Sequence, residues 1–170
     1  MSTDPIFQVQ LVLGYVAWLL CFGVYIWPKL MAMSRFEAHR AIATLHSFRF
    51  FGLVFIVPGV VGALPPGFAG SAAYGDLAAG LLALLALMSV RLRPLFWFFV
   101  VAFNIVGLAD LLLNYYHAIR SGLPAIAGQL AGAYWIPVLY VPILVITHGA
   151  AFTLLLQRQT RAVALSRAGR

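Results

Sequence analysis

Long apolar stretches alternate with short polar segments along this 170-residue chain. A membrane-spanning helix needs about 20 predominantly apolar residues, and five stretches approach or reach that length. They are predicted near residues 6–27, 42–63, 75–91, 95–116 and 134–157. The pattern therefore predicts an all-α integral membrane protein. We expect residues 1–170 to form a single transmembrane domain, a compact bundle of five transmembrane helices.

Local signals place several of the helix boundaries. The residues SRFE at positions 34–37 form a capping box, so the second helix is expected to begin near residue 34, before it enters the membrane. The linker 91–94 is short, which predicts a tight antiparallel hairpin of the third and fourth helices. The segment LPPGFAGSAAYG predicts a loop before the third helix. Residues 118–133 predict a longer loop of small residues.

Composition agrees with a membrane protein. The mean hydropathy is +0.99 and only 9% of the residues are charged, whereas soluble domains carry about a quarter. A chain this short cannot bury so much apolar surface in a soluble core. The net charge of +7 does not indicate a nucleic-acid partner, because the basic residues flank the apolar stretches. The expected partner is therefore the lipid bilayer.

Basic residues gather on one side of the predicted bundle. On that side lie Lys29, Arg35, Arg40, Arg91, Arg93, Arg158, Arg161, Arg167 and Arg170. The opposite side has only Arg120. The positive-inside rule then predicts an N-terminus outside and a C-terminus in the cytoplasm. Arginine outnumbers lysine ten to one, a bias that hints at a GC-rich bacterial genome, so the expected location is the bacterial cytoplasmic (inner) membrane.

Polar groups at membrane depth are the candidate functional residues. An ionisable side chain near the bilayer centre costs about 2.5–3.5 kcal/mol even on the lenient insertion scale, so such groups tend to mark sites. The candidate ligand, ion or proton site consists of Arg49, Asp110, Asn104, His46, His148 and Asp76. The rise of a helix separates Arg49 from Asp110 by roughly 12 Å in depth. A long arginine side chain with one water or ligand is expected to bridge that gap.

Simpler structural interpretations compete at several of these positions. Asp76 directly follows the predicted loop, so an N-cap at the membrane interface is favoured over a role in the site. Asn104 fits an interhelical hydrogen bond equally well. For Arg49 and Asp110 a functional site is favoured, and a structural arginine–aspartate clasp is the alternative. No residue is assigned a catalytic role.

The favoured function is the binding or transport of a small solute, ion or proton at this polar site. One alternative is a b-type haem protein for electron transfer, with His46 and His148 as axial ligands. Another is an accessory or assembly subunit of a larger membrane complex, and a homo-oligomer is also compatible with the sequence. The chain has no GxSxG, HExxH, paired-cysteine or phosphate-loop motif, so nothing in the spacing specifies an intramembrane reaction.

Overall fold

The computed structural model describes residues 4–157, and its regular elements are helical. In chain order they are α1 (Asp4–Cys21), η1 (Phe22–Ile26), α2 (Trp27–Ala32), α3 (Arg35–His46), η2 (Ser47–Ile56), α4 (Pro66–Met88), α5 (Arg93–Arg120), η3 (Leu123–Tyr134), η4 (Ile136–Tyr140) and α6 (Val141–Leu156). The elements η1 and η4 are π-helical turns, whereas η2 and η3 are 3-10 helices. The described residues form no strand, which confirms the predicted all-α class.

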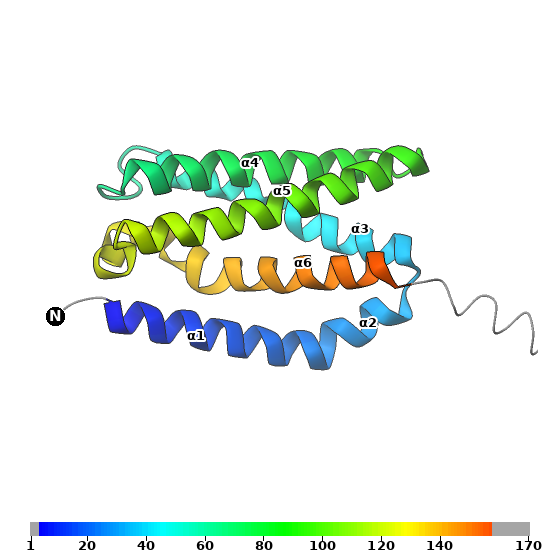
Figure 1. Cartoon of the computed structure of the whole chain (residues 1–170), viewed down its shortest axis with the longest axis horizontal. Helices are drawn as coiled ribbons and strands as arrows, with labels where there is room; N and C mark the ends of the chain where they lie inside the picture. The colour runs from blue at the N-terminus through cyan, green and yellow to red at the C-terminus, as the bar shows by residue number, and fades with distance from the viewer. Residues whose placement is uncertain (1–3, 158–170) are drawn as a thin grey trace, which may run out of the picture.

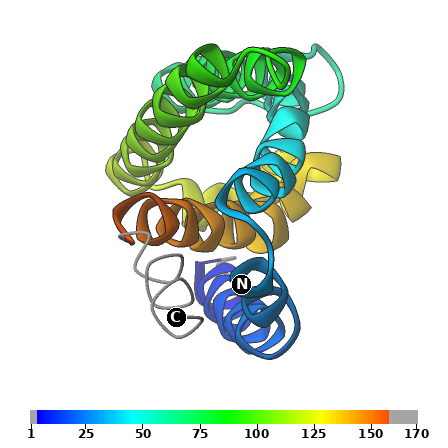
Figure 2. The same ribbon diagram turned by 90° about the vertical axis from the view of Figure 1, so that its right-hand side faces the viewer.

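The helices lie lengthwise beside one another (Figure 1). In the end-on view, α3, α4, α5 and α6 surround the middle of the molecule, and α1 with α2 lies outside them (Figure 2). The helix α4 packs along both η2 and α5, whereas α1 contacts α6, η4 and η3. The interior is therefore formed by the elements that carry the candidate polar residues, and α1 covers it from one side.

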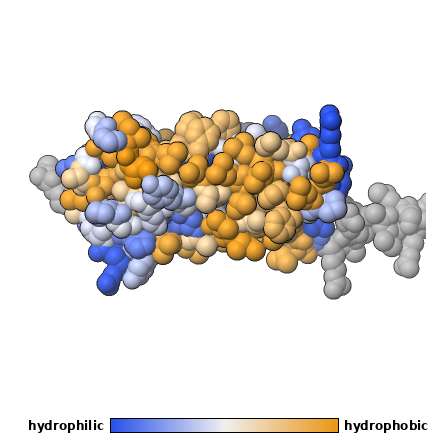
Figure 3. Space-filling model, turned by 90° about the horizontal axis from the view of Figure 1, so that it is seen from above, coloured by the Kyte–Doolittle hydropathy of each residue, from blue (hydrophilic) through white to orange (hydrophobic). Residues whose placement is uncertain are grey.

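Four helical segments are long and apolar enough to cross a membrane by length and composition. They are Asp4–Ala32, Pro66–Met88, Arg93–Arg120 and Ile136–Leu156. Hydrophobic residues cover much of the face shown in Figure 3, and hydrophilic residues lie toward its ends. These features are consistent with integration into a membrane, and the segments correspond to the first, third, fourth and fifth predicted spans.

The remaining predicted span, residues 42–63, is not one continuous α-helix. The helix α3 ends at His46, the chain continues as the 3-10 helix η2 to Ile56, and a turn region follows. A 3-10 helix rises about 2.0 Å per residue, more than an α-helix, so the ten residues of η2 cover about 20 Å. This longer rise helps α3 and η2 together to reach the opposite end of the bundle (Figure 1).

The change to a 3-10 helix also determines which side chains share a face. With three residues per turn, side chains three positions apart lie above one another. His46, Arg49, Gly52 and Phe55 follow this spacing, and all four are buried. The three phenylalanines that lie between Ser47 and Gly52 are exposed. One face of η2 is thus directed at the interior, and the others are apolar surface.

The start of α3 has the predicted capping box. The Ser34 hydroxyl accepts a hydrogen bond from the Glu37 backbone N–H, and the Glu37 carboxylate accepts from the Ser34 backbone N–H, both at 3.2 Å. The hydrogen bonds from Ser34 lower the pKa of Glu37, which is exposed outside the predicted span. The capping box therefore fixes where α3 begins, and with it the position of His46 and η2.

The third predicted helix begins earlier than the sequence indicated. The helix α4 starts at Pro66, not near residue 75, so most of the predicted LPPGFAGSAAYG loop is helical. Proline suits the first turn of a helix, because its fixed φ is helical and its missing N–H is not needed there. Asp76 consequently lies in the middle of α4 and is 6% exposed. The N-cap interpretation of Asp76 was therefore wrong.

The other boundaries differ less from the prediction. The predicted loop 118–133 contains the end of α5 and the 3-10 helix η3, which is interrupted by non-helical backbone at Ile126 and Ala131. The last predicted span begins with the π-helical turn η4. The four arginines predicted to follow that span lie outside the described residues.

The helix α1 is attached to the bundle through a close approach at Gly14. A Cβ atom at this position would overlap the backbone carbonyl oxygen of Val138 in η4. Phe7 and Gly14 are the buried residues of α1. In the most apolar window of Asp4–Ala32, 11% of the residues are buried, against 39%, 39% and 50% in the other three long apolar segments. We conclude that α1 is the peripheral helix of this fold.

Candidate functional site

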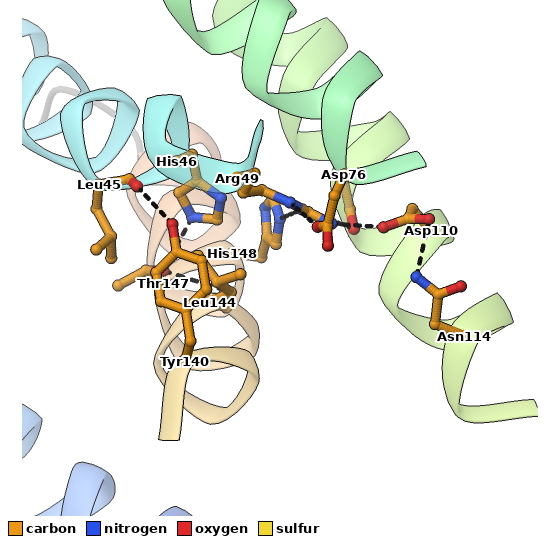
Figure 4. A network of polar contacts seen from close by, with 11 residues as sticks. Leu45, His46, Arg49, Asp76, Asp110, Asn114, Tyr140, Leu144, Thr147 and His148 are labelled. Carbon is orange, nitrogen blue, oxygen red and sulfur yellow. Dashed lines mark hydrogen bonds and ion pairs between the residues drawn. The ribbon is translucent and has the colours of Figure 1, made fainter. Parts of the chain in front are cut away.

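The guanidinium group of Arg49 is the centre of the buried polar network (Figure 4). Its Nε donates to Asp76 Oδ1 at 2.7 Å, and its Nη2 donates to Asp110 Oδ2 at 2.6 Å. Its Nη1 donates to the backbone oxygen of Gly107 at 3.1 Å. Arg49 has no exposed surface. One cation from η2 thus joins an acid from α4 and an acid from α5.

A chain of hydrogen bonds determines how His148 faces Arg49. The Asn104 amide nitrogen donates to the Val100 carbonyl at 2.8 Å, which turns Oδ1 of Asn104 toward His148 Nδ1, 2.9 Å away. Nδ1 of the imidazole therefore carries a proton, and because the Arg49 guanidinium can only donate, Nε2 carries none and the ring is neutral. Its free Nε2 accepts from Arg49 Nη1 at 3.2 Å. Asn104 thus selects the tautomer of His148, and His148 completes the ring of acceptors around the guanidinium.

His46 lies directly beside this ring of acceptors. Its ring contacts that of His148 in a tilted arrangement, with centroids 4.1 Å apart and 49° between the ring planes. The Thr147 hydroxyl donates to the Ile143 carbonyl at 2.7 Å, so it accepts from His46 Nε2 at 3.0 Å. Nδ1 of His46 is then an acceptor, and it is buried without a hydrogen-bond partner. This nitrogen is one of three buried side-chain polar atoms left unpaired in the described residues.

Three glycines leave the space that the charged side chains occupy. A Cβ at Gly52 would overlap the Asp76 carboxylate, and a Cβ at Gly75 would overlap the Asp110 carboxylate. A Cβ at Gly107 would lie 2.5 Å from Arg49 Nη1 and 2.7 Å from His148 Nε2. Each of these positions therefore needs a residue without a side chain. The packing of η2, α4 and α5 is adapted to the ion pairs.

The network contains an imbalance of charge. The chain has only four acidic residues. Two of them, Asp76 and Asp110, both bind Arg49. With both carboxylates ionised the cluster carries one net negative charge. Burying an unbalanced charge is strongly unfavourable. One further positive charge, either a proton or a cation, is therefore required for electrical neutrality.

A cavity lies next to the cluster. It has a volume of about 290 Å³, and Asp76 and Asn114 are among the polar residues that line it. The Asn114 amide nitrogen donates to Asp110 Oδ1 at 3.0 Å, and the Oδ1 of Asn114 has no partner. The acidic side of the cluster thus faces a cavity, whereas its histidine side is closed by packing.

A family model described as a domain of unknown function, DUF8737, matches residues 6–156. The chain belongs to the DUF8737 family. The matched region includes every residue of the polar network, from His46 to His148. The chain matches no curated protein and no solved structure.

In this DUF8737 member, the six residues selected from the sequence lie in one place. Arg49 contacts Asp76, Asp110 and His148 directly, Asn104 binds His148, and the ring of His46 packs against that of His148. The predicted water or ligand between Arg49 and Asp110 was wrong, because Nη2 of the long arginine side chain donates directly to Asp110 Oδ2 at 2.6 Å.

Several residues of the DUF8737 network were not among the six. Thr147 holds His46, Asn114 holds Asp110, and Gly52 makes room for Asp76. For Gly52, the signal was its three-residue spacing from Arg49, which is the period of a 3-10 helix.

A haem held between His46 and His148 does not fit this DUF8737 structure. Two axial ligands bind the iron from opposite faces of the porphyrin, but the centroids of these two rings are 4.1 Å apart, which leaves no room for a macrocycle between them. Both nitrogens of His148 are also engaged. Within residues 4–157, no group of three or more His, Cys, Asp or Glu side chains could hold a metal ion.

Proposed function

We propose that this protein is an integral membrane protein that binds one monovalent positive charge, a proton or a small cation, at the cluster of Arg49, Asp76 and Asp110. The binding of this charge serves the binding or transport of a small solute. The observation that supports the proposal is the unequal charge of the cluster, with two carboxylates on one guanidinium. Groups of this kind inside membrane proteins commonly belong to ion or proton pathways.

The two carboxylates have different surroundings, which suggests different roles. Asp76 lines the cavity and binds Arg49 through Nε. Asp110 is held from two sides, by Arg49 and by Asn114. A proton or cation arriving from the cavity meets Asp76 first, and Asp110 retains the guanidinium during the exchange. His148 presents an unprotonated nitrogen that accepts from Arg49 Nη1, so the histidine side of the cluster adds no positive charge.

The competing interpretation is a static clasp that only joins η2, α4 and α5. A clasp predicts that the charge state of the cluster does not respond to the medium. Infrared difference spectroscopy of the protein in lipid nanodiscs distinguishes the two, because the chain has only four acidic side chains to assign. We expect either a protonated carboxyl signal that changes across the physiological pH range or a carboxylate signal that shifts on exchanging Na⁺ or K⁺ for choline.

Asp110→Asn is the variant that tests this assignment. It is expected to remove the responsive signal, whereas Glu37→Gln, which alters an exposed acid outside the predicted spans, is expected to leave it unchanged. Spectra of the wild type that respond to neither pH nor cations would show that the cluster is only a clasp. A responsive wild type would then justify flux measurements in liposomes.

We also propose that the chain crosses the bacterial cytoplasmic membrane five times, with α3 and η2 as the second crossing. The α2–α3 and α4–α5 turns lie at one end of the bundle (Figure 1), and Arg35 joins the end of α6 to that same end through the Leu155 carbonyl, 2.7 Å away. Basic residues at this end favour the cytoplasm.

Cysteine labelling in intact cells tests the proposed orientation. In a Cys21→Ala background, Ser121→Cys at the end of α5 is expected to react with a membrane-impermeant maleimide. Met33→Cys, in the turn between α2 and α3, is expected to react only after the cells are opened. Both positions are exposed. The reverse pattern would invert the orientation, and labelling of both in intact cells would exclude an odd number of crossings between them.

A further inference from the structure

The cavity beside the charge cluster has largely apolar walls that include four aromatic residues. It is bounded by the first turns of α1, by Phe55 at the end of η2, by α4, by the second half of α5 and by the start of η3. Aromatic rings of Phe7, Phe55, Phe68 and Tyr115 contribute to the lining. The volume of about 290 Å³ is near the lower end of the range for small-molecule pockets. It therefore suits a molecule of modest size with an apolar body.

The polar side chains that line the cavity are one carboxylate and several uncharged amide or hydroxyl groups. Asp76 supplies the carboxylate, and Asn114 supplies an amide whose Oδ1 is buried without a partner. The Tyr115 hydroxyl is already paired with Tyr15 at 2.7 Å. No basic side chain is among the residues lining the cavity, and Arg49 is fully buried behind Asp76. An anionic head group would therefore meet a carboxylate with no cation to balance it.

A cationic head group, in contrast, complements the polar groups of the cavity. An ammonium group donates hydrogen bonds and carries positive charge, so it complements the Asp76 carboxylate and the free Asn114 oxygen. Aromatic faces attract a nearby cation by their quadrupole, and they also provide apolar contact for the rest of the ligand. The ligand would also add the one positive charge that the cluster lacks.

We infer that the cavity binds an amphipathic organic cation, a protonated amine with an apolar body, whose ammonium group contacts Asp76 and Asn114 while its body lies among Phe7, Phe55 and Phe68. This inference rests on the proposed function, because the ammonium takes the place of the proton or small cation at the cluster. It specifies the chemical class of the solute in that proposed function. The amine and the proton or cation would then compete for the same negative charge.

Three probes with the same body and different heads test the inference. Phenylbutylamine, phenylbutanol and phenylbutyrate differ only in carrying a cationic, neutral or anionic head group. Their binding to the full-length protein in nanodiscs can be measured by calorimetry. We expect the amine to bind about tenfold more tightly than the alcohol, in keeping with a desolvated cation–π and carboxylate contact, and the carboxylate to show no detectable binding. Equal affinities, or tighter binding of phenylbutyrate, would overturn the assignment.

Two variants locate the binding site. Asp76→Asn is expected to weaken phenylbutylamine about tenfold by removing the charge contact, while phenylbutanol binds as before. Ala118→Phe places a ring in the cavity from α5 and is expected to abolish binding of both probes, and it keeps the test decisive if Asp76→Asn does not fold. Ala109→Phe, on the exposed face of the same helix, is the matched control and should bind both probes normally.

The outcomes separate this inference from the proposed function. Suppose that phenylbutylamine does not bind the wild type, while the infrared signal of Ala118→Phe still responds to pH or cations. The cluster then exchanges charge, and the cavity assignment is wrong. If phenylbutylamine binds and the infrared response is absent, the cavity takes an organic cation but the cluster does not exchange a proton or small cation. Binding that persists unchanged in Ala118→Phe would place the amine elsewhere.

Discussion

Replacing Arg49 by methionine is expected to destabilise the fold by about 3–5 kcal/mol, the usual cost of removing one partner of a buried ion pair. The loss would be large because one guanidinium serves Asp76 and Asp110 together. Without it, two carboxylates remain close to each other inside the bundle with no cation between them. The free energy of unfolding in mixed detergent micelles, measured by denaturant titration, would show the effect.

Arg40→Met is the matched control, because Arg40 lies on α3 just before η2 and is exposed. We expect it to change stability by no more than about 0.5 kcal/mol. The triple variant Arg49→Met, Asp76→Asn, Asp110→Asn should recover part of the lost stability, because it also removes the two carboxylate charges that Arg49→Met leaves without a cation. Equal effects of Arg49→Met and Arg40→Met would mean that the guanidinium does not hold the bundle together.

Replacing Gly75 by alanine is expected to break the contact of Asp110 with Arg49 at a cost of about 1–3 kcal/mol, a typical penalty for overpacking. A Cβ at Gly75 would occupy the position of the Asp110 carboxylate, so that side chain must leave its rotamer. Gly70, one and a half turns earlier in α4, has open space around it. Gly70→Ala should therefore be neutral or stabilise the helix by up to about 1 kcal/mol.

A double-mutant cycle identifies the cause of the Gly75→Ala effect. In an Asp110→Ala background there is no carboxylate to displace, so adding Gly75→Ala should cost much less than it does in the wild type. The coupling energy between the two positions is the quantity to measure by denaturant titration. If Gly75→Ala costs the same in both backgrounds, its effect comes from the packing of α4 and not from the ion pair.

The four long apolar helices were predictable because the signal for them is local and redundant. Each long apolar helix consists of some 20 residues whose composition alone shows that they avoid water. The capping box at residues 34–37 was equally local, because its two side chains bind backbone groups within a single turn. The helix boundaries were less certain. Small residues and prolines in LPPGFAGSAAYG occur in loops and in tightly packed helices alike, so composition could not show that α4 begins at Pro66.

The polar residues of the network could also be selected from the sequence, because few polar groups occur in the apolar segments and each is expensive to bury in a membrane. The contacts of these residues with one another could not be predicted. The direct contacts of Arg49 depend on η2 being a 3-10 helix, since that period places Arg49 above Gly52 and next to the space that Asp76 fills. Local preference does not favour a 3-10 helix of ten residues. We attribute its presence here to packing against α4 and to the hydrogen bonds of Arg49.

The sequence by itself therefore determined the helical class, the lengths of the apolar segments and the small set of polar residues that require partners. These follow from the free energy of moving each residue out of water, which depends on the residue and its near neighbours. Only the tertiary structure decided that Asp76 and Asp110 share one arginine, that Asn104 sets the tautomer of His148, and that a cavity lies against the acidic side. Those features depend on contacts between four elements far apart in the chain, and glycines at 52, 75 and 107 leave room for them.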